Sequence, residues 1–354
     1  MKYATNLLVG FSLVAGIAVT AHADFQAGIA AANRGDFSVA VKEWEPLAKS
    51  GDAEAQYNLG ALLLSDKVKK TDVKSGIQWI EKAATAGHAQ ASYALGMIFY
   101  TGHGKDVKRD HKRAYQAFEE SAKKGYAPSQ FSIGMMLLNG EGVKKDTAGA
   151  TAWLGKAADQ GHAMAQYNLG MHHARSQSGK KDLAIALQWY LKAANLGLPA
   201  AQYNVAQMYL NGNGTTLDPA MARAWFIKAA DKGSIESQYN LGLMSYYGLG
   251  DSKNLPEAKK WFEGAAKRWD RNAQFYLGKM HMDGEGVKPD AIEAYKWFDL
   301  ASANGHEDAH FFRALAGSKM SDADRDRAHK LAQEWFDSNH KVPHKHYDMK
   351  QHQH

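Results

Sequence analysis

Two short segments of this 354-residue chain have the spacing of a serine–lysine catalytic pair. Ser121-Ala122-Lys123-Lys124 and Ser178-Gly179-Lys180-Lys181 both match S-x-x-K, in which the serine hydroxyl serves as a nucleophile for acyl transfer. Neither is accompanied by the K-T-G sequence of penicillin-binding enzymes, and the chain has no G-x-S-x-G and no phosphate-binding loop. The sequence nominates no catalytic residue, so an envelope enzyme with beta-lactam- or peptidoglycan-related activity remains an alternative hypothesis without a site.

Histidines are concentrated in the polar C-terminal segment, residues 339–354, which is interpreted as a disordered tail. The candidate metal ligands there are His340, His344, His346, His352 and His354. Imidazole nitrogens bind zinc, nickel and copper, but this spacing specifies no coordination geometry. Metal binding by the tail is a second alternative hypothesis, and no cofactor is predicted.

Aromatic residues recur along the chain at a nearly constant spacing. This aromatic stripe consists of Tyr57, Tyr93, Phe131, Tyr167, Tyr203, Tyr239 and Phe275. Aromatic rings provide large contact areas with few rotatable bonds, so the stripe could form the floor of a peptide-binding surface. Packing of the same rings between adjacent helices is an equally open interpretation.

Lysines and arginines cluster in the loops between the predicted helices of each repeat. They are Lys67, Lys69, Lys70, Lys105, Lys108, Arg109, Lys144, Lys145, Lys180, Lys181 and Lys288. A basic edge of this kind could attract an acidic envelope polymer or an acidic partner. A solvated rim with no partner is the alternative, because lysine-rich loops are common on protein surfaces.

These residues are positioned by an internal repeat of about 36 residues. The repeat is marked by a Leu-Gly or equivalent pair, at Gly60, Gly96, Gly134, Gly170, Ala206, Gly242 and Gly278. A fixed period of this size is typical of stacked supersecondary units. Apolar residues at helical spacing form two stripes in each copy, separated by glycine-containing loops, which predicts an all-α array of helix pairs.

The glycine of each Leu-Gly pair falls in the middle of a predicted helix. Glycine there costs about 1 kcal/mol relative to alanine. Its recurrence at nearly every copy therefore predicts that two helices approach closely at this point.

The repeat unit resembles a known family. The segment NGEGVKKDTAGATAWLGKAADQGHAMAQYNLG, residues 139–170, is similar to the Sel1-like repeat, a relative of the tetratricopeptide repeat. The resemblance implies a right-handed α-solenoid of antiparallel helix pairs with a concave groove. It also implies a non-enzymatic adaptor that binds a protein or peptide, in some members with a virulence-associated role. Cysteine-rich relatives are associated with beta-lactam binding, but this chain has no cysteine, so that activity is not carried over.

The resemblance places the aromatic stripe on the groove. Residues four and eight positions further along the same helices vary between copies and are the candidates for specificity. They are Met97, Met135, Met171, Gln207, Lys279 and Tyr247. Successive methionines would give an adaptable apolar surface, although filling gaps in the packing is an equally good explanation for them.

The ends of the chain differ from the repeats. Residues 1–23 are interpreted as a signal peptide, with Lys2 before an apolar segment and Ala21-His22-Ala23 as its cleavage site. We expect a capping helix pair at 24–52, seven repeats at 53–306 and capping helices at 307–338. The expected location is periplasmic or secreted after cleavage near Ala23, without stable membrane insertion.

The charge balance is mildly basic. The formal net charge is +6, with charges of both signs spread along the chain. Nucleic-acid-binding proteins usually concentrate basic residues on one face. We therefore expect no nucleic-acid partner.

Overall fold

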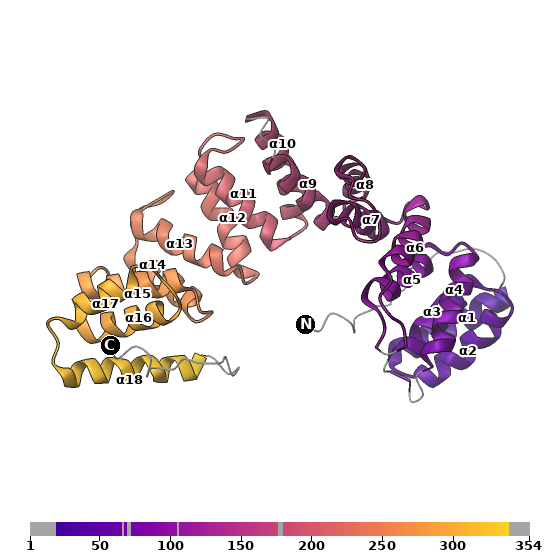
Figure 1. The fold of residues 1–354 in the computed structure, drawn as a ribbon, viewed down its shortest axis with the longest axis horizontal. Coiled ribbons are helices and arrows are strands. Elements are labelled where there is room, and N and C mark those ends of the chain that lie inside the picture. The colour runs from indigo at the N-terminus through magenta and orange to yellow at the C-terminus, as the bar shows by residue number, and fades with distance from the viewer. Residues whose placement is uncertain (1–18, 66, 69–71, 105, 176–179, 340–354) are drawn as a thin grey trace. The chain divides into compact units, whose positions relative to one another are not determined.

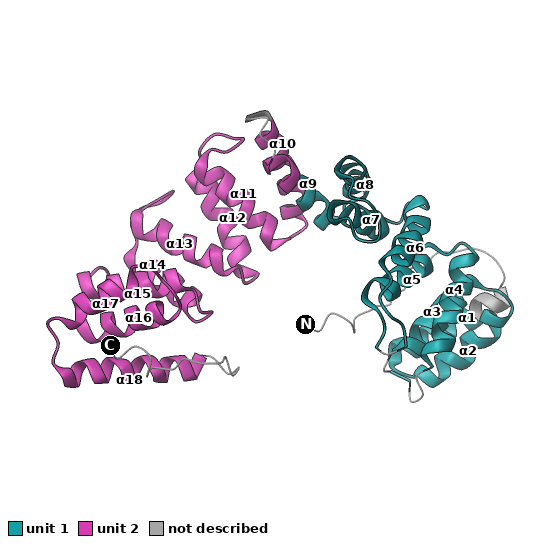
Figure 2. Cartoon of the chain, viewed as in Figure 1, with its two compact units in different colours: residues 1–169 teal, residues 170–354 magenta. Residues whose placement is uncertain are grey.

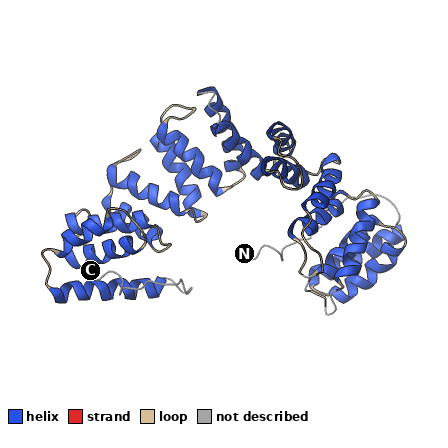
Figure 3. Cartoon of the chain, in the orientation of Figure 1, coloured by secondary structure: helices blue, strands red, loops and turns tan. Residues whose placement is uncertain are grey.

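The computed structural model describes residues 19–339, except residues 66, 69–71, 105 and 176–179. Within those residues all regular structure is helical and no strand is formed (Figure 3). The chain divides into two compact units, residues 1–169 and 170–354 (Figure 2). The boundary falls inside α9 (Ala163–Arg175).

Unit 1 is a succession of helices joined by short loops (Figure 1). They are α1 (Val19–Arg34), α2 (Phe37–Lys49), α3 (Ala53–Leu64), α4 (Val73–Thr85), α5 (Ala89–Thr101), α6 (His111–Lys123), α7 (Ala127–Asn139), α8 (Thr147–Asp159) and the start of α9. The main packing partners are consecutive helices, as in α3 with α4 and α4 with α5. This neighbour-only packing confirms the predicted all-α repeat fold.

Unit 2 continues with the end of α9 and nine further helices in the described part of the chain. They are α10 (Lys180–Asn195), α11 (Pro199–Asn211), α12 (Pro219–Asp231), α13 (Ile235–Tyr247), α14 (Leu255–Ala266), α15 (Arg271–Asp283), α16 (Ala291–Ala303), α17 (Ala309–Gly317) and α18 (Asp322–Asn339). The helices α11 to α16 again pack as consecutive pairs. At the C-terminal end, α17 and α18 both pack chiefly on α16.

Six of the second helices, α4, α6, α8, α12, α14 and α16, begin at a side-chain cap. The capping residues are Asp72, Asp110, Asp146, Asp218, Asn254 and Asp290, and the side chain of each accepts a hydrogen bond from the backbone N–H three residues later. Such a cap satisfies one of the unpaired donors of the first helical turn. These residues therefore set where the second helices start, and the first helices end at residues such as Gly140, which is in the left-handed conformation (φ 76°).

The repeated mid-helix glycines lie where a first helix meets a large side chain of its second helix. A Cβ atom on Gly134 would lie 2.7 Å from Leu154 Cγ, and one on Gly242 would lie 2.4 Å from Phe262 Cε1. Leu154 and Phe262 are almost completely buried. The predicted close approach of the two helices is confirmed, because a side chain at these positions would overlap the core.

The junction after α14 departs from the other repeats. Trp269 has a positive φ of 66° where other repeats have glycine, a conformation that is unfavourable for a residue with a side chain. Its ring stacks on Trp335 of α18 at a centroid distance of 6.5 Å and meets Phe336 edge-on at 4.9 Å. Burial of the indole against α18 offsets the backbone strain at this junction.

Candidate peptide-binding surface

The rings of the aromatic stripe pack between successive repeats and are not free. Tyr57 stacks on His88 at a centroid distance of 4.9 Å, and Phe131 stacks on His162 at 4.7 Å. Both histidines precede the next first helix and cap it, because His88 Nδ1 accepts a hydrogen bond from the Ala91 N–H at 3.1 Å. One face of each of these two rings therefore belongs to the junction between repeats.

Three stripe residues also contact the second helix of their own repeat. Tyr93 lies 5.6 Å from Phe118, Tyr203 lies 5.7 Å from Phe226 and Tyr239 lies 6.1 Å from Phe262, as ring centroid distances. Most stripe residues, Tyr57, Tyr93, Phe131, Tyr167, Tyr203 and Tyr239, keep a partly exposed edge, whereas Phe275 is buried. The stripe thus combines inter-repeat packing with a partial contact surface.

The specificity candidates differ in character between the two units. In unit 1, the side chains of Met97 and Met135 are partly buried, and Met97 packs against the hydrophobic core around Phe99 and Phe118. Met171 and Lys279 of unit 2 are partly buried as well. In unit 2 the residue four positions after the stripe residue Tyr203 is the polar Gln207.

Gln207 is the centre of a network of side-chain amides on unit 2. Its Nε2 group donates to the Tyr203 hydroxyl and to Asn240 Oδ1, both at 3.2 Å. Asn211 Nδ2 donates to Gln207 Oε1 at 3.4 Å. The network joins α11 to α13 and fixes the orientation of each amide.

A tyrosine cluster follows on α13 and α15. Tyr247 is 55% exposed, and its hydroxyl lies 3.2 Å from that of Tyr276. The Tyr276 ring stacks on Phe262 at 5.1 Å. Burial, followed by the nearby Asp270 carboxylate, raises the pKa of Tyr239 to about 12, so this phenol stays protonated at neutral pH.

Tyr276 is a surface residue that the sequence interpretation missed. The stripe residue Phe275 directly precedes it, whereas Tyr276 occupies the position held by Asn240 in the preceding repeat. The substitution of an asparagine by a tyrosine within the repeat was visible in the sequence. That its hydroxyl would reach Tyr247, 29 residues earlier, was not.

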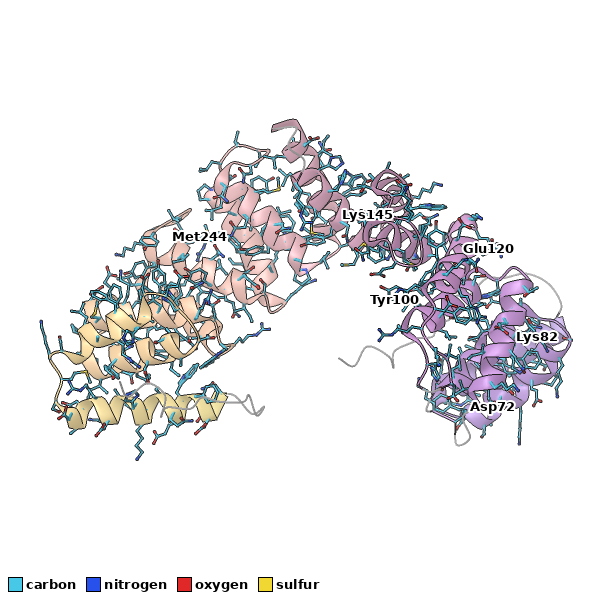
Figure 4. The ribbon with its side chains drawn as sticks, viewed as in Figure 1. Asp72, Lys82, Tyr100, Glu120, Lys145 and Met244 are labelled. Atoms are coloured by element: carbon cyan, nitrogen blue, oxygen red, sulfur yellow. The ribbon has the colours of Figure 1, made fainter. Side chains whose placement is uncertain are left out.

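Within each unit, the loop between the two helices of a repeat packs against the start of the second helix of the preceding repeat. A Cβ atom on Gly142 would lie 2.3 Å from the His111 carbonyl oxygen, so only glycine fits there. The Tyr100 hydroxyl donates to Glu141 Oε2 at 2.6 Å, and this hydrogen bond raises the pKa of Tyr100 to about 12 (Figure 4 labels Tyr100). Loops of consecutive repeats are thereby brought together along one edge.

The basic residues lie along these loops. Lys67, Lys108, Arg109, Lys144, Lys145 and Lys288 are exposed. Lys69, Lys70 and Lys105 lie outside the described residues, and the side chains of Lys180 and Lys181 are not described. Arg109 Nε donates a hydrogen bond to the Thr101 carbonyl at 3.0 Å, so this side chain stabilises the loop between α5 and α6.

The S-x-x-K serine that the structure describes is a packing residue. Ser121 is completely buried, its hydroxyl donates to the Ala89 carbonyl at 2.8 Å and it accepts from the Ser129 hydroxyl at 2.6 Å. This hydroxyl therefore joins neighbouring helices. Ser178 and the tail histidines lie outside the described residues.

One catalytic pattern was overlooked in the sequence interpretation. Residues 306–310 read H-E-D-A-H and match H-E-x-x-H, which in zinc proteases places two histidines on one helical face. Here α17 begins only at Ala309, His306 Nδ1 accepts from the Asp308 N–H at 3.3 Å, and His310 Nδ1 lies 3.3 Å from Arg313 Nη2. In the part of the chain that the structure describes, no three histidine, aspartate or glutamate side chains converge as metal ligands.

The fold defines a class of protein, namely a repeat protein built from stacked antiparallel helix pairs. A model of the Sel1 repeat matches residues 127–162, 163–198, 199–234, 235–268 and 271–306, and a model of plant tetratricopeptide repeats matches residues 48–114. The chain belongs to the Sel1 repeat family.

Solved structures agree with this assignment. A Sel1 repeat protein from Oxalobacter formigenes is 26% identical, with a TM-score of 0.62, over 84% of this chain and 89% of that one. A protective antigen present in uropathogenic Escherichia coli strains, which displays an SLR fold, is 24% identical, with a TM-score of 0.50, over 90% of this chain and 84% of that one. No curated protein matches the chain. None of the described helices has the length and apolar character to cross a bilayer.

Proposed function

We propose that this protein is an exported interaction scaffold that binds an extended segment of another protein through the first-helix surface of unit 2. Sel1 repeat proteins generally mediate protein–protein interaction. The finer proposal rests on the surface formed by α11, α13 and α15. There the helix α13 carries both Asn240 of the amide network around Gln207 and the exposed ring of Tyr247.

The chemistry of this surface suits a peptide backbone. Side-chain amides and phenol hydroxyls both donate and accept hydrogen bonds, as the N–H and C=O groups of an extended chain require. The internal hydrogen bonds of Gln207 and Asn240 hold these groups in place before binding, which lowers the entropy lost on association. Tyrosine rings add contact area at small entropic cost.

A crosslinking pull-down from intact cells tests the surface. We compare the wild type with the double variant Gln207→Ala, Tyr247→Ala, both changed at partly or fully exposed positions. The matched control is Leu217→Ala, Met221→Ala, two exposed apolar residues at the inter-helix loop and start of α12. We expect a discrete partner to be captured by the wild type and the control, and lost from the first variant.

The same experiment can reject the proposal. Equal capture by both variants, each with wild-type helicity by circular dichroism, would remove this surface from the interaction. Export is tested separately by cell fractionation and N-terminal sequencing of the purified protein. Export predicts a chain that begins at Asp24, whereas an uncut chain in the cytosol contradicts it.

A further inference from the structure

The helix α17 is a first helix that lacks the usual partner. In the repeats before it, the first helix packs chiefly on the helix that follows, as in α13 with α14 and α15 with α16. The helix that follows α17 packs on α16 instead. Trp335 of α18 meets Trp297 edge-on at 5.0 Å, and His329 Nδ1 lies 2.7 Å from Asp299 Oδ2. The side of α17 where its second helix would lie is therefore not filled by α18.

The side of α17 that faces away from α16 exposes large apolar residues. One side is buried on α16, where Arg313 forms an ion pair with Asp299 at 2.6 Å. On the other side Phe311 is 65% exposed and Leu315 is 46% exposed, with exposed Ala314 between them. Neighbouring exposed apolar side chains of this size are typical of a surface that contacts another molecule.

Phe311 also continues the interface between repeats. It follows the stripe residue Phe275 by one period of 36 residues. Phe275 is covered by the imidazole of His306, stacked at 4.1 Å, and is only 8% exposed. Among the described residues after α17, no further repeat covers Phe311 in the same way. The exposed face of α17 is thus an inter-repeat interface that ends without its counterpart.

The charges at the two ends of α17 indicate what covers this face. Glu307 and Asp308 lie at its N-terminal end and Lys319 lies just beyond its C-terminal end, all exposed. In an antiparallel pair of identical helices related by a twofold axis, Lys319 of one copy lies opposite Glu307 and Asp308 of the other. Phe311 then packs on Leu315 of the other copy, and the small Ala314 lets the helices approach.

We infer that a second copy of this chain covers α17, through a twofold antiparallel contact between the two α17 helices. Because each copy contributes a single helix of 9 residues, we expect a contact smaller than a standard protein interface and a weak, reversible dimer. The proposed contact involves none of Gln207, Asn240 and Tyr247, which carry the proposed binding surface. Each dimer therefore presents two copies of that surface.

Sedimentation velocity of the purified protein between about 1 and 200 µM tests the inference, a range chosen to bracket a weak dimer. We expect the wild type to dimerise with increasing concentration. Phe311→Ser and Leu315→Ser should each weaken dimerisation by at least about tenfold. Leu217→Ser, which removes another exposed leucine of unit 2, should dimerise like the wild type.

Charge exchange tests the antiparallel geometry. Glu307→Lys and Lys319→Glu should each be monomeric when alone, because each places like charges opposite one another. An equimolar mixture of the two variants should dimerise, because the lysine introduced in one copy then lies opposite the glutamate introduced in the other. A monomeric wild type over the whole range, a dimer that survives Phe311→Ser, or a mixture that stays monomeric would each overturn the inference.

Discussion

At the scale of single residues, the glutamine of the recurring Gln-Tyr-Asn sequence joins one repeat to the next. Gln56 Nε2 donates to the Ala48 carbonyl at 3.0 Å, at the end of the preceding second helix. Gln166 makes the same bond to Ala158. The Gln56 Oε1 atom is buried without a hydrogen-bond partner, whereas Gln130 Oε1 accepts from Gln160 Nε2 at 2.7 Å.

We predict that Ala86→Gln stabilises the protein, because residue 86 ends α4 as Gln160 ends α8. A glutamine there can donate to Gln56 Oε1, and satisfying one buried acceptor contributes about 1 kcal/mol. Urea unfolding followed by circular dichroism measures the change. Ala86→Glu is the control, because a carboxylate has no proton to donate. An equal gain in both variants would show that the amide hydrogen bond is not the cause.

The mid-helix glycines lead to a second residue-scale prediction. Gly134→Ala should destabilise the protein by about 1–3 kcal/mol, because its Cβ atom would lie 2.7 Å from Leu154 Cγ. Gly155→Ala, in α8 of the same repeat, has no atom within 4 Å and should stabilise the helix by about 0.5–1 kcal/mol. Thermal unfolding of the two variants compares them. Changes of the same sign would contradict the packing argument.

At the scale of helices, several repeats begin on a histidine that caps the first helix. His162 Nδ1 accepts from the Ala165 N–H at 3.2 Å, which requires an unprotonated Nδ1. Burial lowers the pKa of His162 and, likewise, that of His306. Protonation would remove the acceptor and place a positive charge at the positive end of the helix dipole.

We therefore predict that acid weakens these junctions. The folded state binds fewer protons at His162 and His306 than the unfolded chain does. Their contribution to stability is thus complete above the unfolded pKa of about 6.5 and is lost as the pH falls through that value toward the lower folded pKa. The melting temperature should fall between pH 7 and about pH 5.5, a window that spans the histidine titration.

Matched variants identify the source of this pH dependence. His162→Asp keeps a capping oxygen that is already charged across that window, so the fall in melting temperature should become smaller. His172→Asp changes a second histidine, one within α9, and should leave the fall unchanged. Identical pH profiles for the wild type and both variants would contradict the role of the cap.

At the scale of the whole molecule, stability should be local, because the main contacts join consecutive helices within each unit. We predict that Gly278→Ala, whose Cβ atom would lie 2.6 Å from Phe298 Cδ1, accelerates hydrogen exchange mainly in α13 to α18. Exchange in α3 to α6 should stay unchanged. Hydrogen–deuterium exchange with mass spectrometry measures both regions, and uniform acceleration along the chain would contradict local stability.

Much of the fold was predictable from the sequence because its causes are local. The period of Leu-Gly pairs, the aspartate caps and the glycine loops specify where helices begin and end within about 36 residues. The mid-helix glycines predicted that two helices approach closely, but they did not indicate which side chain of the second helix makes the contact. The resemblance of the repeat unit then placed the chain in its family.

The candidate surface depended on partners that no repeat pattern specifies. The helix pairs, their order and the spacing of the aromatic stripe could be inferred from the amino-acid sequence. The packing of Tyr57 on the next repeat, the contact of Tyr276 with Tyr247, and the packing of α18 on α16, which leaves Phe311 exposed, became evident only from the folded chain. The physical reason is that helix periodicity is encoded in neighbouring residues, whereas side-chain exposure depends on which distant helix arrives to cover it.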